Sequence, residues 1–115
     1  MNAGKVATAM LIAGGVFVCG VAPAALAADA EAAKTLARQN NCFKCHAVDK
    51  KKEGPAWKDV AAKYKGKPDA EARLIKHLTT GEKAKFDDGH EEDHAIVKSK
   101  NPDEIKNLVD WILSL

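Results

Sequence analysis

The segment Cys42–His46 has the residue types and the spacing needed to hold a redox-active metal group. Its sequence, Cys-Phe-Lys-Cys-His, places two thiols three residues apart with an imidazole directly after them. Residues i and i+3 of a helical turn lie on one side of it, so both thiols could add to the vinyl groups of one haem. This spacing is the attachment signature of haem c. We therefore predict one covalent haem bound through Cys42 and Cys45, with His46 as the proximal iron ligand.

Two other kinds of site also use cysteines at this spacing. A redox dithiol is expected within alternating strands and helices, and a structural zinc site needs a second pair of cysteines or histidines. Neither pattern is convincing in this chain. A disulfide between Cys42 and Cys45 would close a very small loop and stabilise the protein little.

The N-terminal segment has the pattern of an export signal. Lys5 precedes a long stretch without charged residues, and Ala25–Ala27 is a small-x-small cleavage site. Cleavage would divide the chain into a signal peptide, 1–27, and a monohaem domain, 28–115, in the periplasm. An uncleaved membrane anchor and a lipid-modified Cys19 are the alternatives.

Length and composition restrict the class of protein. A chain of 115 residues with 18 Lys+Arg and 16 Asp+Glu has room for one small domain, but not for separate cofactor and substrate domains. After cleavage the remaining domain would bury only a modest share of its surface, so a covalently held cofactor would help to stabilise it. The nearly balanced charge does not indicate a nucleic-acid partner.

Four segments have the pattern of helices. Asp29 is a candidate N-cap for the first, and Asn101 and Pro102 mark the start of the last, with Glu104 at the spacing of a capping box. The predicted segments are Ala30–Asn40, a short helix around Trp57–Tyr64, a third helix between Asp69 and Gly81, and a last helix from Pro102. Apolar residues recur at helical spacing in the first and last segments: Ala33, Leu36, Ala37, Ile105, Leu108, Val109, Ile112 and Leu113.

No stretch of the chain alternates polar and apolar residues as a half-buried strand does, and residues 82–100 show no period at all. We therefore expect an all-α fold of three or four short helices, with a loop over 82–100.

With these motifs, the chain resembles the small bacterial monohaem class I cytochromes c of the periplasm. The resemblance covers nearly all of 30–115, and beyond the haem motif it rests on the segments 54–60 and 108–115. It implies the class I cytochrome c fold, in which the N- and C-terminal helices pack together around one covalent haem. It also implies an electron carrier, and not an enzyme.

The resemblance assigns roles to three residues outside the haem motif. It implies that the carbonyl of Pro55 accepts the Nδ1 proton of His46, which fixes the tautomer and raises the donor strength of the imidazole. It places Trp57 beside the haem and gives Trp111 the role of holding the first and last helices together. Core packing alone is the alternative for both tryptophans.

The chain departs from this family at the sixth iron ligand. The family uses a methionine from the loop before the last helix, whereas both methionines here, Met1 and Met10, lie in the predicted signal. The corresponding loop contains His90 and His94. Apolar residues follow His94 and could anchor it, whereas glycine and acids surround His90, so we predict bis-histidine ligation with His94 as the distal ligand. His90, His77 and an open site are the alternatives.

The run from His90 to His94 also matches the His-Glu-x-x-His motif of zinc proteases. That motif needs an amphipathic helix and a third ligand. Here the segment is almost wholly charged and lies in a small domain, so a solvated loop is the better interpretation.

Lysines close to the haem motif could guide a partner protein. Lys44 and Lys50–Lys52 could frame the exposed haem edge and steer an acidic redox partner into a weak encounter. A solvated lysine run is the alternative.

These features together predict a periplasmic electron-transfer protein that is a monomer, meets its redox partners transiently, and binds neither nucleic acid nor, once cleaved, the membrane. A haem protein that binds or senses a small gas at an open or displaceable sixth site is one alternative, because 82–100 is long and polar with Gly89 as a possible hinge. The electron-accepting subunit of an oxidoreductase is another.

Overall fold

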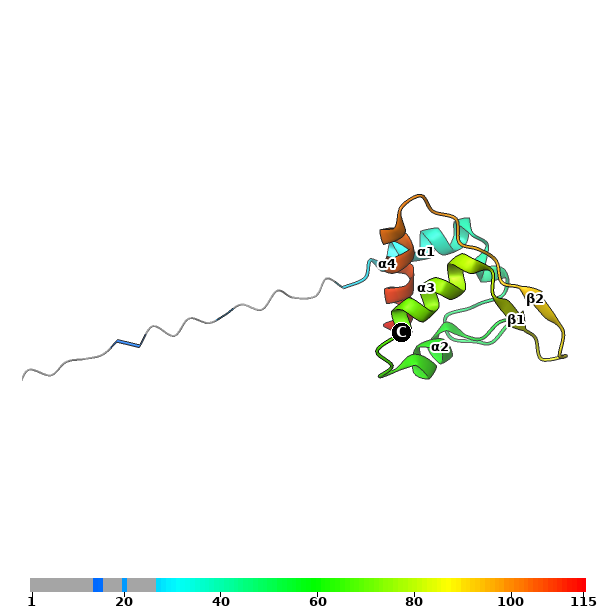
Figure 1. Cartoon of the computed structure of the whole chain (residues 1–115), viewed down its shortest axis with the longest axis horizontal. Helices are drawn as coiled ribbons and strands as arrows, with labels where there is room; N and C mark the ends of the chain where they lie inside the picture. Colours follow the sequence, from blue (N-terminus) through cyan, green and yellow to red (C-terminus); the bar gives the residue numbers. More distant parts are fainter. Residues whose placement is uncertain (1–13, 16–19, 21–26) are drawn as a thin grey trace, which may run out of the picture.

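The computed structural model describes residues 14–15, 20 and 27–115, and every helix and strand lies in the last of these ranges. The predicted export signal, with Cys19, therefore falls almost entirely outside the described residues. The elements are, in chain order (Figure 1), α1 (Ala30–Gln39), a 3₁₀ turn η1 (Cys42–Lys44), α2 (Trp57–Tyr64), α3 (Ala70–Thr80), β1 (Lys83–Lys85), β2 (Glu91–Asp93) and α4 (Pro102–Leu113). None of the described helices is long and apolar enough to cross a membrane.

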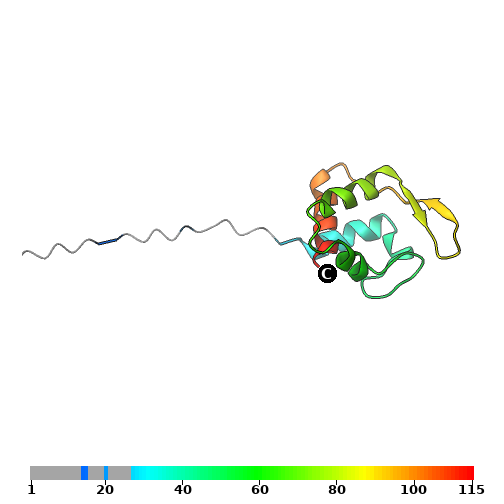
Figure 2. The same cartoon turned by 60° about the horizontal axis from the view of Figure 1, so that its bottom comes forward.

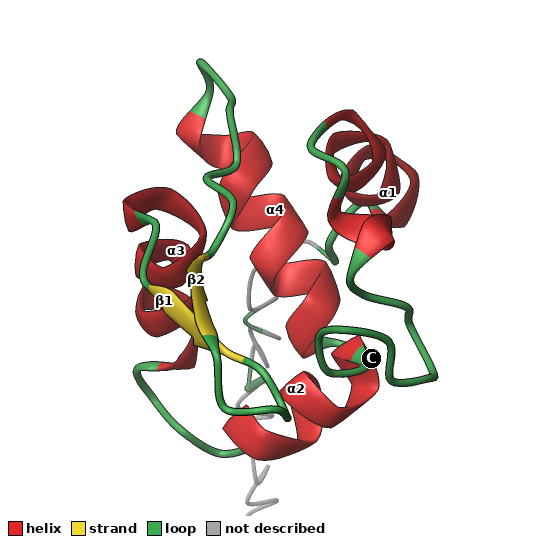
Figure 3. Cartoon of the chain, turned by 90° about the vertical axis from the view of Figure 1, so that its right-hand side faces the viewer, coloured by secondary structure: helices red, strands yellow, loops and turns green. Residues whose placement is uncertain are grey.

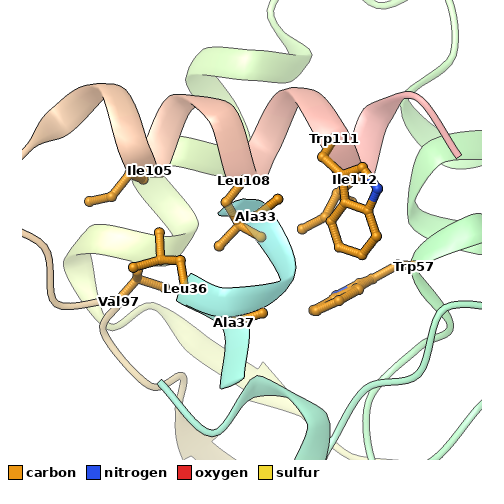
Figure 4. Packing of buried hydrophobic residues seen from close by; sticks show 9 residues of the cluster. All are labelled: Ala33, Leu36, Ala37, Trp57, Val97, Ile105, Leu108, Trp111 and Ile112. Atoms are coloured by element: carbon orange, nitrogen blue, oxygen red, sulfur yellow. The ribbon is translucent and has the colours of Figure 1, made fainter. Parts of the chain in front are cut away.

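The N- and C-terminal helices pack together as predicted, and the core lies between them. Helix α1 begins where the side chain of Asp29 accepts a hydrogen bond from the N–H of Ala32 (3.0 Å). The α1 residues Ala33, Leu36 and Ala37 are all buried, and Figure 4 shows them against the apolar face of α4. Helix α4 contributes Ile105, Leu108, Trp111 and Ile112 to the cluster, α2 contributes Trp57, and the segment before α4 contributes Val97.

Trp111 joins three helices in this core. Its ring meets that of Trp57 on α2 edge to face, with centres 5.5 Å apart and planes at 83° (Figure 4). On the α1 side, the Nζ of Lys34 lies 6.0 Å from the centre of the Trp111 ring. Trp111 therefore links α4 to the N-terminal helix α1 and to α2, the helix that follows the haem motif.

The start of α4 differs in detail from a capping box. Asn101 accepts a hydrogen bond from the N–H of Asp103 (3.0 Å), as the sequence predicts. Glu104 does not bond directly to the N–H of Asn101. The hydroxyl of Ser99 stands between them, because it donates to Glu104 (2.5 Å) and accepts from that N–H (3.1 Å).

A side-chain clasp joins the start of α1 to α4. Asn107 accepts a hydrogen bond from the N–H of Asp29 (2.8 Å) and donates to its carbonyl (2.9 Å). We expect Asn107→Ala to lower the free energy of unfolding of the holoprotein by about 0.5–1.5 kcal/mol, because the N–H of Asp29 loses its partner, whereas its carbonyl still accepts from the N–H of Ala33 (3.0 Å). Urea unfolding measures this, with Lys100→Ala on an exposed side chain as the control. Equal stability of the two variants would contradict the role of the clasp.

Residues 82–100 are not a loop throughout, and here the prediction was wrong. They contain an antiparallel hairpin in which Lys83 pairs with Asp93 and Lys85 with Glu91. Opposite charges face each other across the strands, and a turn with Gly89 at φ +90° closes the hairpin. Each strand has only three residues, and nearly all are exposed, so no apolar alternation marks them in the sequence. The fold remains mostly helical.

The hairpin and the loop after η1 project from the same side of the helices (Figures 1 and 2). Figure 3 shows α4 between α1 and α3, with the hairpin continuing from α3. Lys51, in the loop after η1, forms an ion pair with Asp87 at the hairpin turn. This arrangement brings the Cys-x-x-Cys-His segment and the histidines around the hairpin to one side of the molecule.

Candidate functional site

The turn η1 presents both cysteines of the haem motif. Asn41, in the left-handed conformation at φ 56°, turns the chain out of α1, and asparagine tolerates this conformation well. The N–H groups of Cys45 and His46 then donate to the carbonyl of Cys42 (3.2 and 3.0 Å). Both cysteines are free and partly exposed. Burial raises the pKa of each, and for Cys45 a hydrogen bond to Glu53 adds to the effect, so both are neutral thiols.

The imidazole of His46 has one nitrogen held and the other free to bind a metal. Its Nδ1 donates to the carbonyl oxygen of Pro55 (2.8 Å). Because a carbonyl can only accept, the proton lies on Nδ1 and leaves Nε2 as a ligand atom. The ring stacks on Trp57, with centres 5.6 Å apart and planes at 21°. The structure therefore places Pro55 and Trp57 directly against His46.

Gly54 lets the backbone pass close to the His46 ring. A Cβ at this position would lie 2.5 Å from Cε1 of His46 and 2.9 Å from Nδ1, well inside van der Waals contact. The N–H of Gly54 donates to the carbonyl of Cys45 (2.7 Å), which fixes this close approach. In the sequence, Gly54 stands out only as part of the segment 54–60 that resembles the family, and no local pattern marks this close approach.

His94 faces His46 across the site. Their ring centres are 6.1 Å apart, with planes at 47°. The Nδ1 of His94 donates to the carbonyl of Ala95 (2.9 Å), so its Nε2 is also left unprotonated. Burial is the main cause that lowers the pKa of both histidines, so both imidazoles are neutral near pH 7 and able to bind a metal.

The segment that carries His94 is attached to two helices. Val97, with 6% of its surface exposed, packs into the core below it. Three backbone N–H groups of the segment donate to fixed partners: His94 to the carbonyl of Glu82 (2.9 Å), Val97 to the carbonyl of Leu78 (2.8 Å) and Lys98 to the side chain of Asn40 (2.8 Å). Helix α3, Glu82 at the start of the hairpin and the C-cap of α1 thus hold the segment in place, and Gly89 lies outside this anchored part.

Of the other two histidine candidates, one is exposed on the hairpin and one packs against His94. His90 is exposed, stacks on Phe86 with centres 4.2 Å apart, and bonds to Asp88. His77, on α3, lies beside His94 with ring centres 4.3 Å apart. The centre of the His-Glu-x-x-His run forms strand β2 (Glu91–Asp93) and not a helix, and among the described residues no three ligating side chains are grouped for a metal ion.

The lysine run is not a uniform free patch. Lys44 and Lys50 are exposed. Lys51 pairs with Asp87, and Lys52 donates to the carbonyl of Phe43. The loop after the haem motif is therefore tied to the hairpin and to η1 by two of its lysines.

Glu82, at the start of the hairpin, joins α3 to the His94 segment, and its carboxylate is negatively charged. Arg73 donates to both of its carboxylate oxygens (2.8 and 3.1 Å), and this bond is the main cause that lowers the pKa of Glu82 to about 2. The pKa of this carboxyl is thus lower in the folded than in the unfolded protein. The stability it contributes is complete above about pH 4.5 and is lost as pH falls towards 2.

We therefore expect Glu82→Gln to be less stable than the wild type at pH 7, and the difference to shrink steadily between pH 4.5 and 2.5. Unfolding midpoints of the two holoproteins across this range measure it. Glu91→Gln, on exposed β2, is the control. A constant difference between wild type and Glu82→Gln at every pH would contradict the expectation.

The groups gathered on this side of the molecule are those that a haem c requires. Two free thiols and an imidazole with a free Nε2 follow one another within Cys42–His46, and the aromatic rings of Phe43 and Trp57 lie beside them, with centres 5.2 Å apart. Thioether attachment and axial nitrogen ligation use these groups.

Comparisons with known proteins agree with this chemistry. The family model for cytochrome c matches residues 30–115. Cytochrome c-551 of Pseudomonas aeruginosa is 37% identical over 74% of this chain and 78% of its own length. The crystal structure of the class 1 cytochrome MtoD from Sideroxydans lithotrophicus ES-1 has 67% identity and a TM-score of 0.74, covering 76% of this chain and 97% of that one. Cytochrome c552 of Nitrosomonas europaea has 36% identity and a TM-score of 0.59, covering 71% and 98%.

These similarities extend over the whole helical domain and are not confined to the haem motif. The relatives are small electron-carrier cytochromes and not enzymes. The four helices, with α1 packed on α4, have the arrangement that the sequence predicts for such a protein. The chain therefore belongs to the cytochrome c family, as a monohaem class I electron-transfer protein of the c-551/c-552 type with one covalent haem c.

Proposed function

We propose that this cytochrome is a periplasmic electron carrier whose haem iron has two histidine ligands, His46 and His94, and whose haem is attached through Cys42 and Cys45. Membership of the family supports electron transfer and the covalent haem. The position of His94 opposite His46 is the observation that carries the ligation.

The spacing of the two rings suits one iron between them. A metal–imidazole bond of about 2 Å, with roughly 1.1 Å from nitrogen to ring centre, puts two rings on opposite sides of a metal about 6 Å apart between centres. The rings of His46 and His94 are 6.1 Å apart. In both rings a backbone carbonyl holds Nδ1, so in both the atom left to bind the iron is Nε2.

The haem supplies one-electron chemistry between Fe(III) and Fe(II), and the protein keeps the ligands the same in both states. Pro55 raises the donor strength of His46 through the Nδ1 hydrogen bond. A second imidazole stabilises Fe(III) better than a thioether does. We therefore expect a lower reduction potential than in Met/His relatives, since the only methionines are Met1 and Met10.

The anchoring of the distal segment argues against a displaceable sixth ligand. A gas sensor of this kind needs a ligand that leaves the iron readily. Here three hydrogen bonds from backbone N–H groups and the burial of Val97 hold the segment that carries His94. The coordinately saturated carrier is thus the function that this geometry favours.

Export and partners form the rest of the proposal. Removal of 1–27 would leave 28–115 as a periplasmic monomer that meets redox partner proteins transiently and binds neither nucleic acid nor the membrane. Lys44, within the haem motif, and Lys50, just after it, are exposed and suit an acidic partner. The intact mass of protein purified from the periplasm tests the cleavage, and should equal 28–115 plus one haem.

Optical and EPR spectra of the oxidised holoprotein, followed by reduction under CO, test the ligation. Two nitrogen ligands predict a low-spin ferric spectrum and a reduced spectrum that CO leaves unchanged. A high-spin spectrum that CO converts after reduction would contradict the proposal and would favour the gas-binding alternative.

A further inference from the structure

We propose that His77 is a positioning residue for the distal ligand: its imidazole packs against that of His94 and sets the angle at which the His94 ring meets the iron. This inference rests on the proposed ligation by His94. It assigns a role to a histidine that neither attaches the haem nor binds its iron.

The two rings are in direct contact. The centres of His77 and His94 are 4.3 Å apart, with planes at 43°, whereas His94 and His46 are 6.1 Å apart. His77 comes from the last part of α3, and its side chain is 32% exposed. Its ring therefore forms one wall against the distal imidazole, within the range of centre-to-centre distances at which aromatic rings pack.

His77 is itself held in place by a residue that also holds His94. The Nδ1 of His77 lies 3.1 Å from a carboxylate oxygen of Glu82, and Arg73 donates to both oxygens of that carboxylate. The backbone carbonyl of Glu82 accepts the N–H of His94 (2.9 Å). The side chain and the main chain of Glu82 thus fix the two histidines relative to each other.

The hydrogen bond of the His94 ring does not by itself fix the angle of the ring. Its one side-chain hydrogen bond among the described residues runs to the carbonyl of the next residue, Ala95, which moves with it. The 47° between the planes of His94 and His46 therefore depends on the wall that His77 forms. The EPR g-anisotropy of a low-spin ferric haem with two imidazoles follows the angle between their planes, so this role has a spectroscopic signature.

Three variants of the holoprotein test the inference. His77→Ala removes the ring and its hydrogen bond. His77→Phe keeps a flat ring at the same place and loses only the hydrogen bond. His90→Ala removes an exposed histidine that stacks on Phe86 and is the matched control.

We expect His77→Ala to remain low-spin, to shift or broaden its largest g value, and to keep a reduced spectrum that CO leaves unchanged, because the ring loses an aromatic contact but the iron keeps both ligands. His77→Phe should stay close to the wild type in both measurements, and His90→Ala should equal it. Three results would overturn the inference: unchanged g values in His77→Ala, equal changes in the Ala and Phe variants, or a high-spin His77→Ala protein, which would make His77 the ligand. A wild type without two nitrogen ligands would instead refute the proposed function.

Discussion

A His94→Ala protein is expected to lose the low-spin ferric spectrum and to bind CO once it is reduced. The mutation removes the imidazole that lies 6.1 Å from the ring of His46, while the Val97 and Lys98 hydrogen bonds that hold the segment remain. The haem should stay attached, because the cysteines lie in η1 at a different part of the chain. Optical and EPR spectra before and after reduction under CO measure the change.

His90→Ala is the matched control for this prediction. His90 comes from the same hairpin region, but it is exposed and bonds to Asp88 at the hairpin turn. Its removal should leave the spectrum unchanged. If His94→Ala kept the wild-type spectrum and His90→Ala lost it, the distal ligand would be His90 and the proposed ligation would be wrong.

Gly54→Ala is expected to have a comparably large effect, through its contact with His46. The added Cβ would lie 2.5 Å from Cε1 of His46, and the hydrogen bond from Gly54 to Cys45 (2.7 Å) prevents the backbone from moving away. Either the ring gives up its hydrogen bond to Pro55 or the loop refolds. Overpacking of this kind costs about 1–3 kcal/mol.

We expect the Gly54→Ala holoprotein to unfold at a clearly lower urea concentration and to show a changed ferric spectrum, because His46 is displaced. Gly89→Ala is the control, since a Cβ there would meet nothing within 4 Å. Its φ of +90° makes it a strained variant as well, but one without contact with His46. A Gly54→Ala protein with the wild-type spectrum and stability would show that the ring can yield without cost.

Different parts of the chain hold His46 and His94. His46 is fixed by residues close to it in the chain, namely Cys42, Gly54 and Pro55. His94 is fixed by groups on α3 and α1. A substitution that displaces His46 should therefore disturb mainly the loop after η1. The effect of a substitution that displaces His94 should depend on how α3 and α1 pack.

The amino-acid sequence by itself determined the features that arise between neighbours in the chain. The spacing within Cys42–His46 predicts covalent haem because the reactive groups need only one turn of chain to come together. Asp29 and Asn101 cap their helices as predicted, since a cap bonds to N–H groups two or three residues away. The apolar spacing of α1 and α4 similarly predicted the faces that pack against each other.

Only the tertiary structure decided which histidine faces His46. Three histidines were available, and the apolar residues after His94 favoured it, but the hydrogen bonds from this segment to α3 and to the C-cap of α1 join residues far apart in the chain and follow no local pattern. The hairpin was missed for a related reason, because its short strands are held by charge pairing and by the turn, without an apolar alternation. The contact between the rings of His77 and His94 likewise exists only once α3 and the hairpin have packed. Glu82, which bonds to His77, helps to hold this arrangement.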